Sequence, residues 1–303
     1  ILSAMARVGR LTVVLVFVLF EIAFGQIASN PITACPKLAP RKPKDVNDLG
    51  PADFKVVMAL GDSITAGFGL MGQAGALDEF RGWSGFIGGN ENNVTLPDFF
   101  RHYAPLVTGF SINEHFLELA GDKYHPEDRC NAAQSGATTT DLHAEVDHIL
   151  QVLKNESTVD IENDWKFLNI LIGANDACPL CKRGDKPTVQ QAGDVYEQNL
   201  NDAITYVYDT LPKTLVNIIP LFNLSGVYYL GLNKTYCKDF HELFPWECPC
   251  AFDSTTENRE YLDDVVSEYR NRVVAIAEQW QSLGLPDFNV IYQPFTWDIN
   301  VAE

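Results

Sequence analysis

The stretch Gly61-Asp62-Ser63, which ends a short apolar run, holds the residues of this chain best suited to chemistry. The run itself, Lys55 to Leu60, predicts a buried parallel strand that ends in a tight turn. Open α/β sheets place their chemistry at this carboxyl edge. The hydroxyl of Ser63 is therefore a candidate nucleophile, provided that a base and an oxyanion hole accompany it. Because Asp and Ser are also common turn residues, the triplet alone is weak evidence.

Two later segments offer an oxyanion hole. Ser135-Gly136 stands just before an expected helix, and Gly173-Ala174-Asn175-Asp176 follows an expected strand. We expect the backbone N–H groups of Ser63 and Gly136 and the side-chain amide of Asn175 to face the oxyanion. Taken separately, Gly136 could simply open a helix, and Asn175-Asp176 could cap one. Together and in this order, the three segments indicate a serine hydrolase. It lacks the Gly-x-Ser-x-Gly elbow, because Thr65 stands where the second glycine belongs.

The elements that must position these residues alternate between strand and helix. Apolar runs and helical periodicity predict strands at 55–60, 167–172, 214–222 and 288–292, and helices at 95–103, 138–154, 190–211 and 257–283. Residues 223–256 are expected to form a long loop with cysteines and aromatic residues. This alternation predicts one α/β domain around a parallel, doubly wound sheet. Right-handed crossovers then bring the carboxyl ends of all strands to one edge.

Composition narrows the class of partner. The chain has 303 residues, of which 46% are hydrophobic, so it can bury a sizeable core. Its net charge of −18 comes with no basic stripe, which argues against a nucleic-acid partner and gives no help in binding anionic membrane surfaces. Neutral and zwitterionic substrates remain compatible with this charge.

The amino-terminal residues indicate secretion. Arg7 and Arg10 precede the apolar run 11–20, and Ala23-Phe24-Gly25 is a small-x-small cleavage site, so residues 1–25 are expected to be a signal peptide. An uncleaved anchor is the alternative. Four sequons predict N-linked glycans on a secreted or extracellular membrane-associated protein, at Asn93, Asn155, Asn223 and Asn233.

The cysteine count fits an oxidising compartment, in which most cysteines form disulfides. Seven is an odd number, so one cysteine lacks a partner within the chain. A zinc site built from Cys178, Cys181, Cys248, Cys250 and His241 is the alternative. The Cys-x-Cys spacing is unusual for zinc, and secretion favours disulfides.

At these motifs the chain resembles a known family. Leu60-Gly61-Asp62-Ser63, Ser135-Gly136 and Gly173-Ala174-Asn175-Asp176 are similar to the first three blocks of the GDSL (SGNH) serine hydrolases. Longer motifs resemble the animal membrane-associated phospholipase B type over about residues 30–295, namely 80–84, 87–89, 175–181, 217–219 and 222–224. The resemblance implies a three-layer flavodoxin-like fold without metal or cofactor. It also implies a lipase that hydrolyses acyl esters of phospholipids and lysophospholipids.

One departure from the family concerns the base. The family's last block, Asp-x-x-His, follows the final strand, whereas no histidine follows residue 292 here. Asp122-Lys123-Tyr124-His125 has the right spacing but precedes the second block, so we expect His125 to be a surface histidine. The expectation is that residues 26–303 form a hydrolase domain without its last block, with low turnover. A partner cysteine and any membrane tether would then lie in the missing part.

Aromatic residues in the loops bear on the substrate. These residues are Phe80, Trp83, Phe86, Tyr228, Tyr229, Phe244 and Trp246. They would line an acyl groove or contact a lipid interface; the alternative is that they pack under the loops. A monomeric, secreted phospholipase B-type lipase is the leading hypothesis. The alternatives are a carbohydrate or small-acyl esterase on the same fold and a catalytically inactive, secreted lipid-binding protein.

Overall fold

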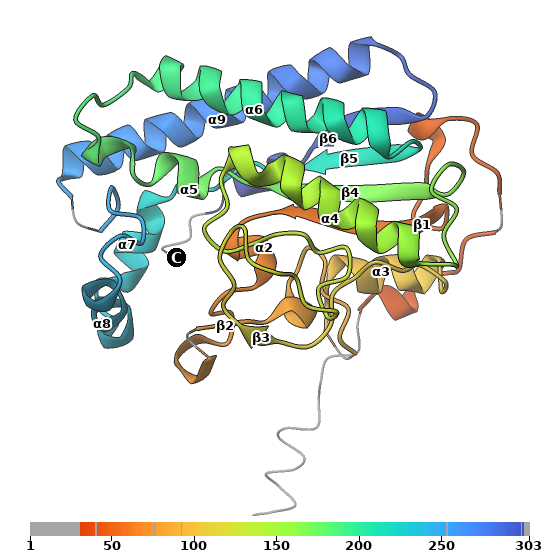
Figure 1. The fold of residues 1–303 in the computed structure, drawn as a ribbon, viewed down its shortest axis with the longest axis horizontal. Coiled ribbons are helices and arrows are strands. Elements are labelled where there is room, and N and C mark those ends of the chain that lie inside the picture. The colour runs from red at the N-terminus through yellow and green to blue at the C-terminus, as the bar shows by residue number, and fades with distance from the viewer. Residues whose placement is uncertain are drawn as a thin grey trace, which may run out of the picture.

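The computed structural model describes residues 31–39, 41–75, 77–91, 93–252, 254–297 and 299, so the expected signal peptide lies outside the described residues. Four parallel strands form the central sheet in the order β1-β4-β5-β6 (Figure 1). Their bounds are Phe54–Gly61, Trp165–Leu171, Thr214–Ile218 and Phe288–Tyr292. The predicted α/β fold with a parallel sheet is confirmed.

Helices cover the sheet in layers. The long helices α4 (Leu142–Asn155), α6 (Val189–Thr210) and α9 (Thr256–Ser282) pack on one face, and α3 (Leu96–Tyr103) lies on the other (Figure 1). Strand β1 shows how two cores arise from one strand, because successive side chains alternate between the faces. Met58 and its neighbours at even positions join the larger core, whereas Val57 and Ala59 join the core under α3.

The outer edge of β1 is lined by irregular chain. Ala59 N donates to Cys130 O at 2.9 Å, and Ala132 N donates to Ala59 O at 2.9 Å. Residues 130–132 therefore extend the sheet without forming a regular strand. Strands β2 (Asp78–Glu79) and β3 (His115–Phe116) form a separate antiparallel pair nearby.

Two expectations about local structure are wrong. Strand β5 ends at Ile218 and not at residue 222, because Pro220 has no N–H to continue a ladder. Residues 223–256 are not one loop, since they contain α7 (Ser225–Gly231) and α8 (Thr235–Leu243). Aromatic residues four apart contact each other along α8, as the rings of Tyr236 and Phe240 do at 6.2 Å, and such pairs stabilise a helix.

Two smaller differences concern where helices begin. Helix α4 begins at Leu142, later than expected, after a 3₁₀ turn (Thr139–Asp141) with a capping box at Thr138. The turns after β1 and β4 each open a single-turn helix, α2 (Ser63–Ala66) and α5 (Ala174–Ala177). Both short helices stand at the carboxyl edge of the sheet.

Four of the cysteines form disulfides, Cys178–Cys248 and Cys181–Cys250. The zinc alternative is therefore wrong, because these sulfurs are already bonded to each other. Cys35, Cys130 and Cys237 are free, so three cysteines lack an intramolecular partner where one was expected. The two disulfides tie the chain after β4 to the loop that precedes α9.

Candidate active site

Ser63 is held at the tip of β1 by its immediate neighbours. Asp62 caps α2, because its Oδ1 accepts a hydrogen bond from Ile64 N at 3.0 Å. A Cβ on Gly61 would lie 2.5 Å from the carbonyl oxygen of Leu171, so only glycine allows β1 and β4 to approach here. Within the described residues, neither the N–H nor the hydroxyl of Ser63 has a hydrogen-bond partner. Both groups are therefore available to a ligand.

Gly136 lies on the loop beside β1. Its φ of +81° is in the left-handed region that favours glycine, although a Cβ would meet nothing closer than 3.9 Å. Conformation, and not space, therefore requires glycine at this position. The loop is bound to the nucleophile turn, since Gln134 N donates to Gly61 O at 3.1 Å. No group in the described part of the chain accepts a hydrogen bond from Gly136 N–H.

The turn after β4 is bound to that same loop. Asn175 Nδ2 donates to Ala137 O at 2.8 Å, and the Asp176 carboxylate accepts from Thr139 N and from Thr139 Oγ1 at 2.6 Å. Asn175 is inside α5 and does not cap it, because Gly173 occupies the cap. The third segment is therefore fixed directly on the second.

Ser63, Gly136 and Asn175 line one cavity of about 220 Å³. A second lobe of about 300 Å³ also has Ser63 and Asn175 in its wall. Apolar side chains dominate the walls of both, among them Leu117, Leu119, Phe244 and Trp246 in the first and Phe222, Val227, Tyr236 and Phe252 in the second. The structure thus brings the three predicted residues together between two apolar lobes.

The aromatic residues singled out in the sequence divide into two groups. Phe244 and Trp246 line the first lobe. The others pack elsewhere: Phe80 on Trp83 at 5.9 Å, Phe86 against the core, Tyr228 under Arg259, and the exposed Tyr229 on Tyr228 at 5.2 Å. Most of these aromatic residues therefore pack under loops and do not line the cavity.

Buried carboxyl groups lie near Ser63. Burial is the main cause that raises the pKa of Asp62 to about 7; the hydrogen bond from Ile64 N–H opposes the rise, and the nearby Asp176 and Glu247 add to it. Burial also raises the pKa of Asp176 and of Glu247, whose side chain lines both lobes. These groups therefore hold protons to a higher pH than exposed carboxyls do, which limits negative charge around Ser63.

Glu145 of α4 is a site residue that the sequence analysis missed. Its Oε2 accepts a hydrogen bond from Gly61 N at 2.8 Å, so α4 supports the turn that carries Ser63. Complete burial raises the pKa of Glu145 well above its ordinary value. The available signal was a carboxyl on the apolar face of the helix, between Leu142 and Ile149.

No histidine in the described part of the chain is hydrogen-bonded to Ser63. His125 pairs with Glu118 at 2.6 Å and lines neither lobe, in keeping with the surface role expected of it. His241 lines the second lobe, where it stacks on Phe252 at 3.3 Å and burial lowers its pKa. No carboxylate among the described residues is hydrogen-bonded to His241 to orient it. Among the described residues, no group of three His, Cys, Asp or Glu side chains is arranged to hold a metal ion.

A serine hydroxyl without a partner among the described residues, free N–H donors and an apolar cavity meet at one edge of a parallel sheet, an arrangement typical of α/β serine hydrolases. Residues 57–302 match the family described as GDSL-like Lipase/Acylhydrolase, and the chain belongs to it. The chain is 30% identical over 278 residues to "Phospholipase B1, membrane-associated" from Rattus norvegicus, and the aligned residues cover 88% of this chain and 18% of the rat protein. The Homo sapiens protein of that name is 27% identical over 281 residues, covering 89% of this chain and 18% of the human protein. The chain thus spans about a fifth of the length of these relatives.

Proposed function

We propose that this chain hydrolyses acyl esters of phospholipids and lysophospholipids, with Ser63 as the nucleophile. One observation carries the proposal: Ser63, Gly136 and Asn175 line a single apolar cavity, and the N–H groups of Ser63 and Gly136 have no partner among the described residues. That is the arrangement acyl transfer requires, with free donors beside a free hydroxyl. The similarity to two phospholipases supports the lipid substrate.

The mechanism follows from these positions. Ser63 Oγ attacks the ester carbonyl carbon, and the carbonyl oxygen becomes an oxyanion. The N–H groups of Ser63 and Gly136 and the Nδ2 of Asn175 donate hydrogen bonds to that oxyanion. Collapse of the intermediate expels the alcohol, which is the lysophospholipid or the glycerophospho-alcohol, and leaves an acyl ester on Ser63. Water then attacks the ester and releases the fatty acid.

Each half of the reaction needs a proton acceptor. Ser63 must lose a proton as it attacks, and the leaving alcohol must gain one. Because no described imidazole is hydrogen-bonded to Ser63, we assign this role to none of the histidines described above. We therefore expect the 303 residues alone to turn over slowly, with only the residual catalysis that binding and the oxyanion hole provide.

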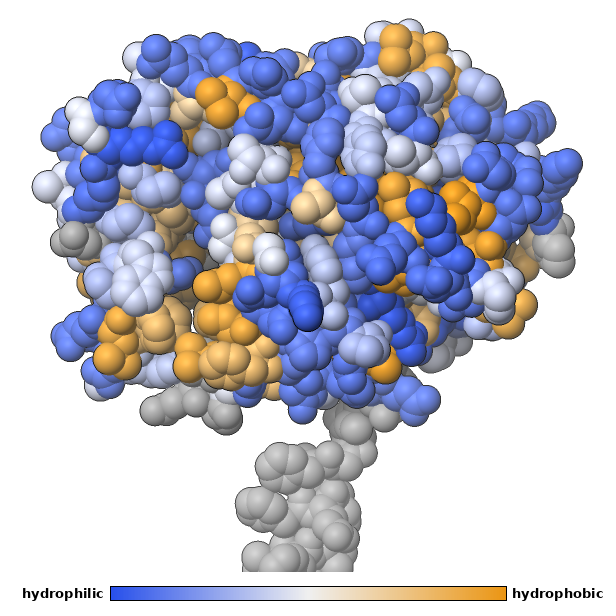
Figure 2. Space-filling model, in the orientation of Figure 1, coloured by the Kyte–Doolittle hydropathy of each residue, from blue (hydrophilic) through white to orange (hydrophobic). Residues whose placement is uncertain are grey.

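The surface around the cavity suits a lipid aggregate. Apolar side chains gather over α8 and over the chain that carries β2 and β3 (Figure 2). The exposed ones include Leu70, Met71, Phe116, Leu119, Leu243 and Trp246. Leu119 and Trp246 also line the first lobe, so the apolar surface continues into the cavity. A patch of this kind marks a binding surface more often than a solvated one.

We further propose an extracellular location, either secreted or membrane-associated. Two disulfides fit an oxidising compartment. Asn155, Asn223 and Asn233 are exposed and are the proposed glycan sites, whereas the Nδ2 of Asn93 is buried and does not fit a glycan. In the described part of the chain, no helix is long and apolar enough to cross a membrane.

The test is fatty-acid release from lysophosphatidylcholine micelles by the protein as its gene encodes it, beside Ser63→Ala. Release by the wild type and none by the variant supports the proposal. Acetylated sugars and lysophosphatidylcholine are compared in the same assay. Acetate release without fatty-acid release would favour the carbohydrate esterase instead. Micelle binding with no acyl release from any substrate would favour the lipid-binding protein.

A further inference from the structure

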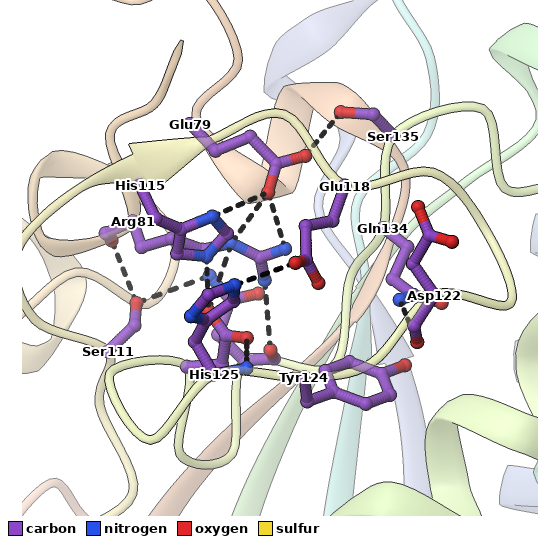
Figure 3. Close-up of polar contacts among 12 residues, drawn as sticks. Glu79, Arg81, Ser111, His115, Glu118, Asp122, Tyr124, His125, Gln134 and Ser135 are labelled. Carbon is purple, nitrogen blue, oxygen red and sulfur yellow. Dashed lines mark hydrogen bonds and ion pairs between the residues drawn. The ribbon is translucent and has the colours of Figure 1, made fainter.

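A buried charged network lies beside the oxyanion loop and has no part in the mechanism above (Figure 3). Arg81 stands between two carboxylates, with Nη2 2.7 Å from Glu79 Oε2 and Nε 3.2 Å from Asp128 Oδ1. All three side chains are at most 1% exposed. Charges buried this deeply are costly unless they are paired, so the network must hold its geometry to persist.

The two oxygens of Glu79 have different partners. Oε2 binds Arg81, whereas Oε1 accepts a hydrogen bond of 2.5 Å from Ser135 Oγ. The second contact is not needed to balance the charge of Arg81. It is a charge-assisted hydrogen bond, a class that is short and about twice as strong as a neutral one. Glu79 is therefore placed to fix Ser135.

Fixing Ser135 fixes the neighbouring donor. The N–H of Gly136 belongs to the planar peptide group that joins it to Ser135, so the two move together. Gly136 alone does little to fix its own φ and ψ angles, because glycine tolerates many backbone conformations. Two more bonds hold the loop: Arg81 Nη1 donates to Asn131 O at 3.1 Å, and Ala120 N donates to Ser135 O at 3.0 Å.

We propose that Glu79 and Ser135 are positioning residues, which aim the Gly136 N–H at the reacting carbonyl. This inference rests on the proposed function. Glu79 reaches Ser135 from β2, a strand that lies 56 residues before Ser135 in the sequence. Arg81 acts one step further away, because it holds the Glu79 carboxylate in place from the opposite side.

The test compares Ser135→Ala with a matched control, Ser111→Ala. Both serines are buried and belong to the network, but Ser111 Oγ donates to the carbonyl of Arg81, at 2.7 Å, and not to Glu79. We expect Ser135→Ala to lower kcat by about 10- to 100-fold with KM unchanged, as a misaimed donor would. Ser111→Ala should lose about as much thermal stability as Ser135→Ala does and should keep the kcat of the wild type.

A double-mutant cycle separates positioning from general support. If Ser135 acts through the oxyanion hole, its effect on kcat shrinks once Asn175→Ala has already damaged that hole. A merely structural role would give additive effects. If Ser135→Ala does not fold, Ser135→Cys replaces it, because the thiol has a similar size and is a weak donor.

Several outcomes overturn the inference. Wild-type kcat in Ser135→Ala or Ser135→Cys overturns it while leaving the proposed function intact. Equal losses of kcat in the Ser135 and Ser111 variants do the same. An inactive wild-type protein, or an active Ser63→Ala variant, overturns the proposed function and this inference with it.

Discussion

At the scale of single residues, the site depends on groups that are left without partners. Ser63 N–H and Gly136 N–H are free within the described chain, and Asn175 Nδ2 makes one bond, to Ala137 O. An amide nitrogen carries two hydrogens, so Asn175 keeps one that is available for the proposed oxyanion. Bonded donors elsewhere in these loops hold the backbone rigid. Free donors at fixed positions are what electrostatic preorganisation requires.

Asn175→Ala tests this role directly. The change removes one oxyanion donor, so kcat should fall by about 100- to 1000-fold with little effect on KM. Steady-state kinetics on a soluble short-chain ester measure both constants. Asn199→Ala is the control, because Asn199 Nδ2 bonds Thr139 Oγ1 and the residue lines neither lobe. A fall in kcat of equal size in both variants would contradict the assignment.

Glu145 makes a prediction about stability and pH. Because its pKa is raised in the folded protein, the folded state favours the protonated carboxyl, which costs stability as the pH rises above the ordinary value of 4.5. Glu145→Gln keeps the acceptor for Gly61 N–H and does not ionise. The variant should therefore gain stability relative to the wild type as the pH rises above 4.5.

Urea unfolding at several pH values measures this difference. Glu145→Ala is the comparison, since it leaves Gly61 N–H unpaired and should lose about 1–3 kcal/mol. A stability difference between Glu145→Gln and the wild type that does not change with pH would show that Glu145 is not protonated when folded.

At the scale of elements, the disulfides determine where the wall of the cavity stands. Cys178 and Cys181 follow β4, and they hold Cys248 and Cys250 beside the site. Trp246 and Glu247, which line the first lobe, lie directly before Cys248. Neither disulfide joins neighbours in sequence, because the separations are 70 and 69 residues. The loop before α9 thus forms part of the cavity wall because the disulfides cross-link it there.

Replacing Cys181 and Cys250 by Ser should lower the free energy of unfolding by about 2–5 kcal/mol, since a long closed loop is released in the unfolded chain. Urea denaturation measures the loss. Denaturation with a reducing agent is the control, because reduction should destabilise the wild type more than the variant, which has already lost one disulfide. Equal stability of the variant and the wild type under oxidising conditions would contradict a structural role for this disulfide.

At the scale of the whole molecule, charge and hydrophobicity favour a neutral lipid surface. The net charge of −18 repels anionic vesicles, while exposed apolar side chains stand at the cavity mouth. Leu243 and Trp246 are the most exposed near the site, at 70% and 69%. Binding should therefore be stronger to zwitterionic than to anionic bilayers.

The double change Leu243→Ser, Trp246→Ser should weaken binding to phosphatidylcholine vesicles and lower activity on micelles. Activity on a soluble short-chain ester should change much less, because neither residue is a donor to the oxyanion. Vesicle sedimentation and the two assays measure this. Leu283→Ser is the control, an equally simple loss of an exposed apolar side chain beyond α9. Equal losses on both substrates would contradict a surface-binding role.

Local patterns in the sequence were sufficient for most of the sheet and for the three site segments. Apolar runs predicted β1, β4 and β6, and helical periodicity predicted α6 and α9 within a residue or two. Ser63 and Asn175 were predicted to lie together because each follows a parallel strand, and parallel strands end at one edge of the sheet; Gly136 was predicted from its place before a helix. Where aromatic residues and cysteines interrupted the pattern, as in α8, periodicity failed.

Only the tertiary structure decided what surrounds those residues. Glu145 and Ser135 look like ordinary polar residues along the chain, and their roles depend on Gly61 and Glu79, 84 and 56 residues away. The disulfide pairing was likewise open until folding brought Cys178 beside Cys248. Sequence by itself determined the elements and the chemistry at their ends, because both depend on neighbours in the chain. Support for that chemistry depends on contacts between distant segments, and these exist only in the folded protein.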